Sequence, residues 1–219
     1  MVKYKMKYGK WLDNWYTAYV KPTLKSKTCE RYSEVIEGHL KAALGEYALK
    51  DVTSTVVCDY VTRLLRCGNL KTGEALSSST VNGIIFVIRG SLKAACDAGI
   101  IKRCYLGGIA RRKSEGRTVT CFSEREQRVL EQTVLSGKKR NHIGILICLY
   151  TGLRIGELLA PTWADVDFEN GVISVNKTCH YGKDENGVFG RITERPKTLS
   201  SKRAIPLPKK LSLESFCFI

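Results

Sequence analysis

Residues 146–168 read LICLYTGLRIGELLAPTWADVDF, and this stretch decides the fold of the second half of the chain. Its first part belongs to an apolar run, 141–154, which predicts a fully buried helix ending at Gly152. Glycine readily adopts the left-handed conformation that ends many helices. A short helix is expected to follow over residues 155–163.

Strands are expected after these helices, because the hydrophobic period changes. The segment VDFENGVISVNKT (166–178) predicts a β-hairpin that turns at Asn170 and Gly171, a dipeptide that tolerates the positive φ of tight hairpins. The segments ITERPK (192–197) and KRAIPLP (202–208) predict another strand pair. Helices followed by strands make this half an α+β unit.

Another helix is expected just before the deciding stretch. Ser123 and Glu126 have the spacing of a capping box, in which each residue bonds the main chain of the other. The helix is expected to reach about residue 135, with three apolar side chains facing inward: Val129, Leu130 and Val134.

The first 101 residues predict a helical domain. Their apolar residues recur at helical spacing, and no stretch alternates as a strand would. Thr53 is a candidate N-cap, since its hydroxyl can accept a bond from the first turn of a helix. The expected helices cover residues 8–20, 26–43, 53–67 and from the serine cluster 77–79 to about Gly99.

Residues 102–118 break this pattern and predict a basic linker. The run KRCYLGGIARRKSEGR (102–117) has three glycines and no apolar period. It would join a helical domain over residues 1–101 to an α+β domain over residues 119–219. Such a run is usually a solvated loop, but between two basic domains it could also follow a phosphate backbone.

The charge balance points to a polyanionic partner. Lysines and arginines number 36 against 21 aspartates and glutamates, which gives a formal net charge of +15. An acidic membrane surface is the alternative to nucleic acid, but no stretch approaches the roughly 20 apolar residues of a spanning helix, and no signal peptide opens the chain. We therefore expect a cytoplasmic protein that binds double-stranded DNA through basic residues that include Lys25, Lys27, Arg111, Arg112, Lys113 and Arg117.

The nine cysteines do not indicate a metal site or a disulfide framework. None belongs to a C-x-x-C pair, the spacing typical of zinc ligands. Most lie inside apolar periodic segments, so we expect buried, reduced thiols and no metal.

Two motifs carry a resemblance to a known family. TGLRIGE (151–157) matches the pattern T-G-[LM]-R-x-[GS]-E, and RPKTLSSKRAIPL (195–207) matches a hairpin lysine placed just ahead of a strand ending in I-P-L. Residues 11–32 and 77–101 are similar to a small helical core-binding domain. Taken together, these features make the chain resemble the tyrosine recombinases, or phage integrases. The resemblance extends to about Pro208.

The resemblance implies both a fold and a chemistry. The fold is mainly α with a small β part: a helical, SAM-like core-binding domain followed by a truncated α+β catalytic domain. The chemistry is attack of a tyrosine hydroxyl on a DNA phosphate, with a covalent phosphotyrosyl intermediate. This reaction needs no metal and no nucleotide cofactor.

Three residues take the family's roles at matching positions. Arg154 would donate two parallel hydrogen bonds to the phosphate oxygens, since a guanidinium stays protonated at working pH. Lys197 would act as the general acid toward the leaving 5′ oxygen, although Lys202 or Lys177 could be mistaken for it. Glu157 would support Arg154 or its helix. The alternative for Arg154 is a surface arginine neutralised by Glu157.

The sequence also departs from the family pattern. The family uses an H-x-x-R pair, a further His or Trp, and a tyrosine nucleophile near its C-terminus. The sequence has no H-x-x-R, and no tyrosine follows Tyr181. We therefore expect a C-terminally truncated recombinase without an extra N-terminal arm-binding module, which binds DNA but does not cut it alone.

Two functions remain open from the sequence. One is a truncated integrase of a phage or conjugative element, with other recombinase protomers and an excisionase-type accessory protein as partners on DNA. The other is a non-enzymatic DNA-binding regulator or competitor derived from an integrase. Neither implies a small-molecule substrate.

Overall fold

The structure is a computed structural model that describes residues 6–104, 109, 111–113, 118–137, 142–183, 187–196, 198 and 201–207. It divides into two compact units, Met1–Arg117 and Thr118–Ile219. The predicted fold class, mainly helical with a small β part, is confirmed.

The first unit is built from helices, and the expected helices are confirmed. Two of them contain a π-helical turn, a feature that the hydrophobic period does not encode. The elements are α1 (Tyr8–Trp15) continued by η2 (Tyr16–Val20), α2 (Ser26–Val35) continued by η3 (Ile36–Leu40) and α3 (Lys41–Leu44), then η4 (Leu49–Asp51), α4 (Ser54–Cys67) and α5 (Ser78–Asp97).

Hydroxyl side chains start α4 and α5. The Thr53 hydroxyl accepts a bond from the Val56 amide at 3.5 Å, and the Ser77 hydroxyl accepts one from the Thr80 amide at 3.2 Å. Both residues are therefore N-caps. The expectation that this half contains no strand is confirmed for residues 6–104, where Lys7 and Ala48 form only an isolated antiparallel bridge.

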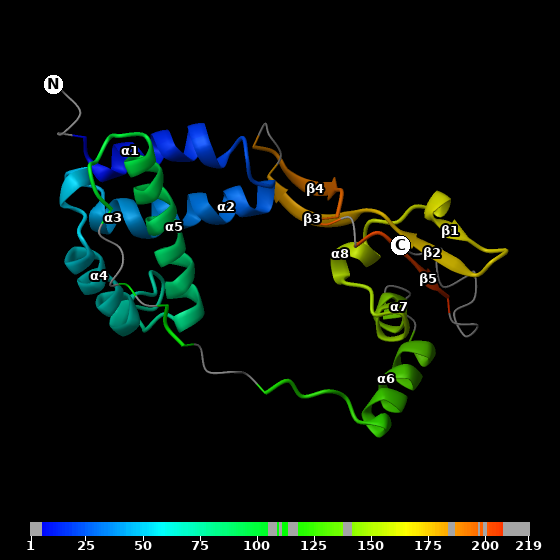
Figure 1. The fold of residues 1–219 in the computed structure, drawn as a ribbon. Helices are drawn as coiled ribbons and strands as arrows, with labels where there is room; N and C mark the ends of the chain where they lie inside the picture. Colours follow the sequence, from blue (N-terminus) through cyan, green and yellow to red (C-terminus); the bar gives the residue numbers. More distant parts are fainter. Residues whose placement is uncertain are drawn as a thin grey trace. The chain divides into compact units, whose positions relative to one another are not determined.

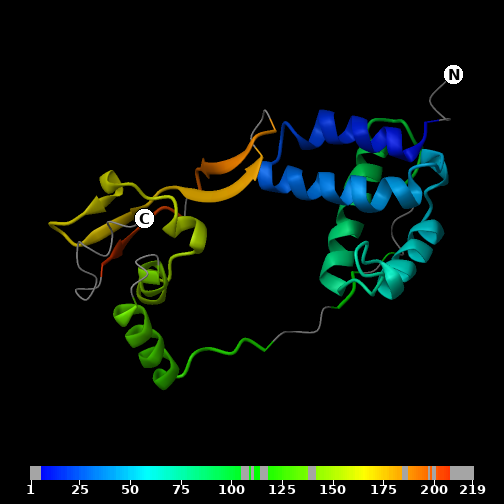
Figure 2. The ribbon, with the colours of Figure 1, turned by 180° about the vertical axis from the view of Figure 1, so that it is seen from behind.

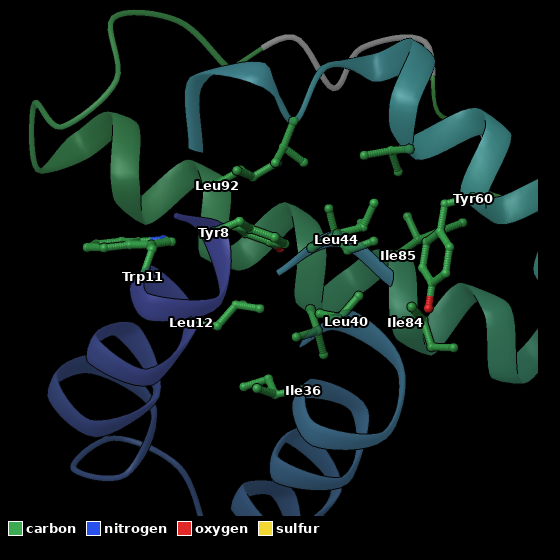
Figure 3. Packing of buried hydrophobic residues seen from close by; sticks show 14 of the residues in the cluster. Tyr8, Trp11, Leu12, Ile36, Leu40, Leu44, Tyr60, Ile84, Ile85 and Leu92 are labelled. Atoms are coloured by element: carbon green, nitrogen blue, oxygen red, sulfur yellow. The ribbon is translucent and has the colours of Figure 1, made fainter. Parts of the chain in front are cut away.

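The core of the first unit gathers around α5. Figure 3 shows α1 side chains such as Tyr8, Trp11 and Leu12 packed in one cluster with α5 side chains such as Leu92. The Tyr8 hydroxyl lies 2.8 Å from the Ser91 hydroxyl, and the Trp11 indole N–H donates to the Ser91 carbonyl at 2.8 Å. These bonds satisfy the polar atoms of two buried aromatic side chains.

Part of the expected linker packs on the first unit. Ile109 is 3% exposed and belongs to the helical core. The main chain of Arg112 bonds the side chain of Asn82 on α5. The chain after α5 therefore returns to the start of that helix, where residues 111–113 lie beside it (Figures 1 and 2).

The second unit combines short helices with two small antiparallel sheets. One sheet has the strand order β1-β2-β5, and the other pairs β3 with β4 (Figure 1). The elements are α6 (Glu124–Ser136), α7 (Ile143–Thr151), α8 (Ile155–Leu158), η6 (Trp163–Asp165), β1 (Val166–Asp167), β2 (Val172–Val175), β3 (Thr178–Lys183), β4 (Phe189–Glu194) and β5 (Arg203–Pro206).

The predicted pairing of the last two strands is wrong. Both strands exist, but β4 pairs with β3, with Thr178 opposite Glu194, whereas β5 pairs with β2, with Val175 opposite Arg203. Alternation identifies a strand without naming its partner, because any strand with a matching apolar face can pair with it. This pairing brings Arg203 into the candidate site.

Two helices of the second unit are more exposed than predicted. In α6, the capping box of Ser123 and Glu126 is confirmed, but Val129 is 56% exposed and only Val134 is buried. In α7, Ile145 is 45% exposed, so the helix is not fully buried. An apolar run predicts a helix, but it does not predict which sides of that helix the rest of the fold covers.

The hairpin turn is confirmed, with one correction. Strands β1 and β2 flank it, and Gly171 adopts φ 63°. Asn170 does not share this conformation, since every residue with positive φ in the described part of the chain is a glycine. The turn therefore needs the left-handed conformation at only one of the two positions.

The cysteines are less buried than expected. Among the eight that lie in described residues, all are free thiols, only Cys179 is buried, and Cys67 and Cys121 are exposed. The other five are half-buried and pack against the two hydrophobic cores: Cys29, Cys58, Cys96, Cys104 and Cys148. The described residues contain no group of three or more potential metal ligands. No helix in them is long and apolar enough to cross a bilayer.

Candidate functional site

The candidate site begins where α7 ends. Gly152 closes that helix with φ 66°, and its N–H donates to the Cys148 carbonyl at 2.9 Å. Leu153 is then buried, and Arg154 occupies the N-cap position of α8. The side chain of Arg154 is 76% exposed. The buried leucine beside it anchors the turn, so the guanidinium stands at the surface on a fixed backbone.

Glu157 lies under Arg154 and fixes it in two ways. Its carboxylate accepts the Arg154 backbone N–H at 3.1 Å and the Arg154 Nη1 at 2.9 Å. Although Glu157 is only 5% exposed, these bonds keep its charge compensated. The carboxylate therefore caps α8 and holds the arginine next to it.

A second arginine completes the cluster. Arg203, the first residue of β5, donates Nη2 to Glu157 Oε2 at 2.8 Å and Nη1 to Glu157 Oε1 at 3.3 Å. This pair chiefly lowers the pKa of Glu157 to about 2, with smaller contributions from the Arg154 bonds, against the opposing effect of burial. Glu157 is therefore ionised at neutral pH and is shared by two guanidinium groups.

Arg203 was not predicted as a site residue from the sequence. It is one of many basic residues near the end of the chain. Its contact with Glu157 depends on the strand register, which places Arg203 opposite Val175. The sequence signal was only the predicted strand over residues 202–208, and the structure shows that Arg203 takes a partly buried position on it. A charged side chain at such a position needs a partner, and Glu157 was the acidic residue of the preceding motif.

The close contact between α8 and β3 depends on a glycine. A Cβ at Gly156 would lie 2.6 Å from the Thr178 hydroxyl oxygen and 2.8 Å from the Cys179 carbonyl oxygen. Backbone atoms of a paired strand cannot easily move away. Only glycine lets α8 lie this near to β3, and this helix carries both Arg154 and Glu157.

The variant Gly156→Ala is expected to destabilise the second unit by about 2 kcal/mol, since the methyl group overpacks the contact between α8 and β3. The measurement is hydrogen exchange of peptides from residues 143–175 in the full chain. Gly190→Ala is the matched control, because no atom lies within 4 Å of its Cβ position. Equal effects of the two variants would contradict the proposed clash.

A second buried carboxylate, that of Asp165, connects the segment before β1 with the two residues between β2 and β3. Asp165 accepts bonds from the amide and hydroxyl of Thr162, both at 2.8 Å, from Asn176 at 2.8 Å and from the Lys177 ammonium at 2.7 Å. Burial by itself raises the pKa of Asp165, but the bond from Lys177 and those from Thr162 and Asn176 together hold it well below its usual range. The ammonium group of Lys177 is therefore already paired with Asp165.

The remaining candidate residues lie in several places. Lys197 and Arg117 fall outside the described residues. Lys202 is exposed beside β5. In the first unit, Lys25 is exposed at the N-cap position of α2, and Lys27 pairs with Glu30 at 2.6 Å.

The basic residues Arg111, Arg112 and Lys113 are exposed, and they belong to the first unit. Arg154 and Glu157 are the only pair of predicted catalytic residues that the described part of the chain brings into contact. Their cluster offers no carboxylate group of the kind that would hold a metal ion, because the single carboxylate is already neutralised by two arginines.

Comparison with family models gives two matches. Residues 7–65 match the phage integrase N-terminal SAM-like domain, and residues 122–212 match the phage integrase family. The second match spans the entire cluster of Arg154, Glu157 and Arg203.

Curated relatives agree with these matches. The chain is 26% identical over 214 residues to a tyrosine recombinase XerC-like protein of Caldanaerobacter subterraneus subsp. tengcongensis, covering 93% of this chain and 52% of the relative. It is 24% identical to the ICEBs1 integrase of Bacillus subtilis, covering 81% of this chain and 45% of the relative. The chain thus spans about half the length of these two relatives.

Solved structures with the same fold include two integrases bound to DNA. The Tn1549 transposon integrase in complex with transposon right end DNA aligns with a TM-score of 0.75 and 21% identity, over 97% of this chain and 63% of that one. A lambda integrase dimer bound to a core site aligns with a TM-score of 0.64 and 19% identity, over 87% of this chain and 49% of that one. At this identity the likeness concerns the fold.

Proposed function

The chain belongs to the phage integrase family of tyrosine recombinases, and we propose on this basis that it binds duplex DNA in the site-specific recombination of a phage or conjugative element. The observation that carries the proposal is the exposed guanidinium of Arg154, fixed at the start of α8 by a buried carboxylate. Its ligand would be a phosphodiester of the DNA backbone.

The geometry of Arg154 suits this role. A guanidinium has five N–H donors, and Glu157 takes one of them through Nη1. The other donors can form parallel hydrogen bonds to the two non-bridging oxygens of a phosphate. These hydrogen bonds would become stronger as negative charge develops on the oxygens. Glu157 acts as a positioning residue, because it is ionised and bonded and has no proton to transfer at neutral pH.

Other parts of the proposal concern partners and chemistry. Lys197 would protonate the leaving 5′ oxygen, with exposed Lys202 as the alternative, and no metal or nucleotide cofactor would take part. Copies of the recombinase would assemble on the DNA, as the lambda integrase does in its dimer on a core site. An excisionase-type accessory protein and a cytoplasmic site of action remain predictions.

These 219 residues by themselves are proposed to bind DNA without cutting it. They contain no H-x-x-R pair and no tyrosine after Tyr181. Without an activated nucleophile, covalent catalysis loses nearly all of its rate enhancement. A suicide duplex that traps a covalent intermediate tests this point, and a protein–DNA adduct formed by these residues would contradict it.

The variant Arg154→Ala is expected to weaken duplex binding about tenfold, the usual loss for a charge-assisted contact to a phosphate. Arg154→Lys should recover only part of this loss, because an ammonium cannot span two oxygens. The measurement is fluorescence anisotropy of a labelled short duplex over a range of salt concentrations, since phosphate contacts weaken steeply with salt.

Arg128→Ala is the matched control for this experiment. The Arg128 side chain is also 76% exposed and also pairs with a carboxylate on its own helix, Glu124 at 3.5 Å. Its removal changes the net charge equally and is expected to weaken binding no more than about twofold. Equal losses of affinity in both variants would mean that Arg154 makes no specific contact with DNA. Absence of any duplex binding at low salt would contradict the proposed function.

A further inference from the structure

The side chain of Asn82 holds the main chain of Arg112 through both of its polar groups. The Arg112 N–H donates to Asn82 Oδ1 at 2.9 Å, and Asn82 Nδ2 donates to the Arg112 carbonyl at 2.9 Å. An amide side chain that satisfies both groups of one residue imitates the edge of a strand. It fixes the position and direction of the bound segment.

A second attachment lies farther along α5. Arg89 donates Nη2 to the Ile109 carbonyl, and the Ile109 side chain is 3% exposed within the helical core. Asn82 and Arg89 are seven residues apart, so they share one face of the helix and are separated by about 10.5 Å along its axis. Ile109 and Arg112 are three positions apart in the sequence, a separation that an extended chain spans in about 10 Å.

The two spacings match, so Ile109 and Arg112 can both be held on the same face of α5. The attachment uses main-chain groups and a buried isoleucine, which leaves the side chains of Arg111, Arg112 and Lys113 exposed. Three consecutive basic side chains on a fixed backbone form a site for a polyanion with little further loss of entropy on binding.

We propose that Asn82, assisted by Arg89, is a positioning residue that makes Arg111, Arg112 and Lys113 a preformed phosphate-binding edge of the helical unit. We call Ile109 and residues 111–113 in this position the docked segment. The docking rests on hydrogen bonds and burial alone. The assignment of DNA phosphates as its ligand rests on the proposed function.

The docking is tested first, without DNA. In Asn82→Leu both bonds are lost, while leucine is the better helix former, so α5 should remain intact. Trypsin cleavage after Arg111, Arg112 and Lys113 is expected to become about tenfold faster, because the open population of the segment rises. Mass spectrometry of the early fragments measures this.

Asn69→Leu is the matched control for the proteolysis. The Asn69 side chain also makes two bonds to main-chain groups, the amides of Lys71 and Thr72 at 3.0 and 3.3 Å. Its loss should leave cleavage in the docked segment unchanged. A cleavage rate in Asn82→Leu equal to that of the wild type would overturn the docking.

The phosphate-binding role is tested with two complementary variants. Asn82→Leu keeps every charge and loses the docking, so duplex affinity should fall severalfold with little change in salt dependence. The triple alanine variant, Arg111→Ala with Arg112→Ala and Lys113→Ala, keeps the docking and loses the charges, so the slope of log affinity against log salt should become shallower by about 2.7.

The outcomes separate the two proposals. If the wild type binds no duplex, the proposed function fails, and the proteolysis result stands by itself. If the wild type binds but the alanine variant retains its affinity and salt slope, the docked segment is not a phosphate-binding edge. If Asn82→Leu is cleaved faster yet binds with unchanged affinity, the docking exists but does not serve DNA binding.

Discussion

Glu157→Ala is expected to lower the free energy of unfolding of the second unit by about 3 kcal/mol. The substitution leaves the Arg203 guanidinium, 33% exposed, without its anion and removes the carboxylate that caps α8. Removing one partner of a buried ion pair is strongly destabilising, although the solvent around the two arginines limits the loss. Hydrogen exchange of peptides from residues 143–175 in urea, measured on the full chain, reports it.

The same variant should change the pH dependence of this unit. The pKa of Glu157 is about 2 in the folded chain against an ordinary 4.5. A lowered pKa means that the ionised form stabilises the fold, so this stabilisation is fully present above pH 4.5 and is lost as the pH falls toward 2. The wild type should therefore lose about 3 kcal/mol more than Glu157→Ala over this range.

Glu169→Ala is the control for both measurements. Glu169 is exposed in the loop between β1 and β2, and its loss is expected to cost less than about 0.5 kcal/mol. If Glu157→Ala unfolds like this control, then Glu157 does not hold the two arginines together. A small effect on stability with an unchanged pH profile would contradict the cluster described above.

Tyr8→Ala is expected to lower the free energy of unfolding of the first unit by about 4 kcal/mol. Tyr8, the first residue of α1, is 0% exposed and packs in one cluster with α5 side chains (Figure 3). Loss of a buried aromatic side chain removes its transfer free energy and leaves a cavity. Hydrogen exchange of α5 peptides in urea measures the effect.

Tyr8→Phe separates the ring from the hydroxyl. The Tyr8 hydroxyl lies 2.8 Å from the Ser91 hydroxyl, which also donates to the Ile88 carbonyl at 3.0 Å. Ser91 thus keeps a partner, and the loss should be only about 1 kcal/mol. A phenylalanine variant as unstable as the alanine variant would show that the hydroxyl, and not the packing, supports this contact.

The helices of the first unit were predictable because their information is local. The periodic apolar residues and the hydroxyl caps, such as Thr53 and Ser77, act within a few residues of the chain. The π-helical turns at Tyr16–Val20 and Ile36–Leu40 were not predictable. The extra residue in such a turn does not change which residue types make up the apolar face of the helix.

The candidate site was predictable only in part. Arg154 and Glu157 are three residues apart on one short helix, so their contact follows from helical geometry. Arg203 lies 46 residues from Glu157, and its contact depends on β5 pairing with β2 and not with β4. That choice is made by which apolar faces meet when the sheet assembles, a long-range event that alternation along one strand does not encode.

The sequence by itself determined the family, the order of a helical and an α+β unit, and the residue types that can hold a phosphate. The tertiary structure alone decided which side chains cooperate: Arg203 on Glu157, and Asn82 on the main chain of Arg112. The physical reason is distance along the chain. Local propensities act over a few residues, whereas these contacts join segments that only packing brings together.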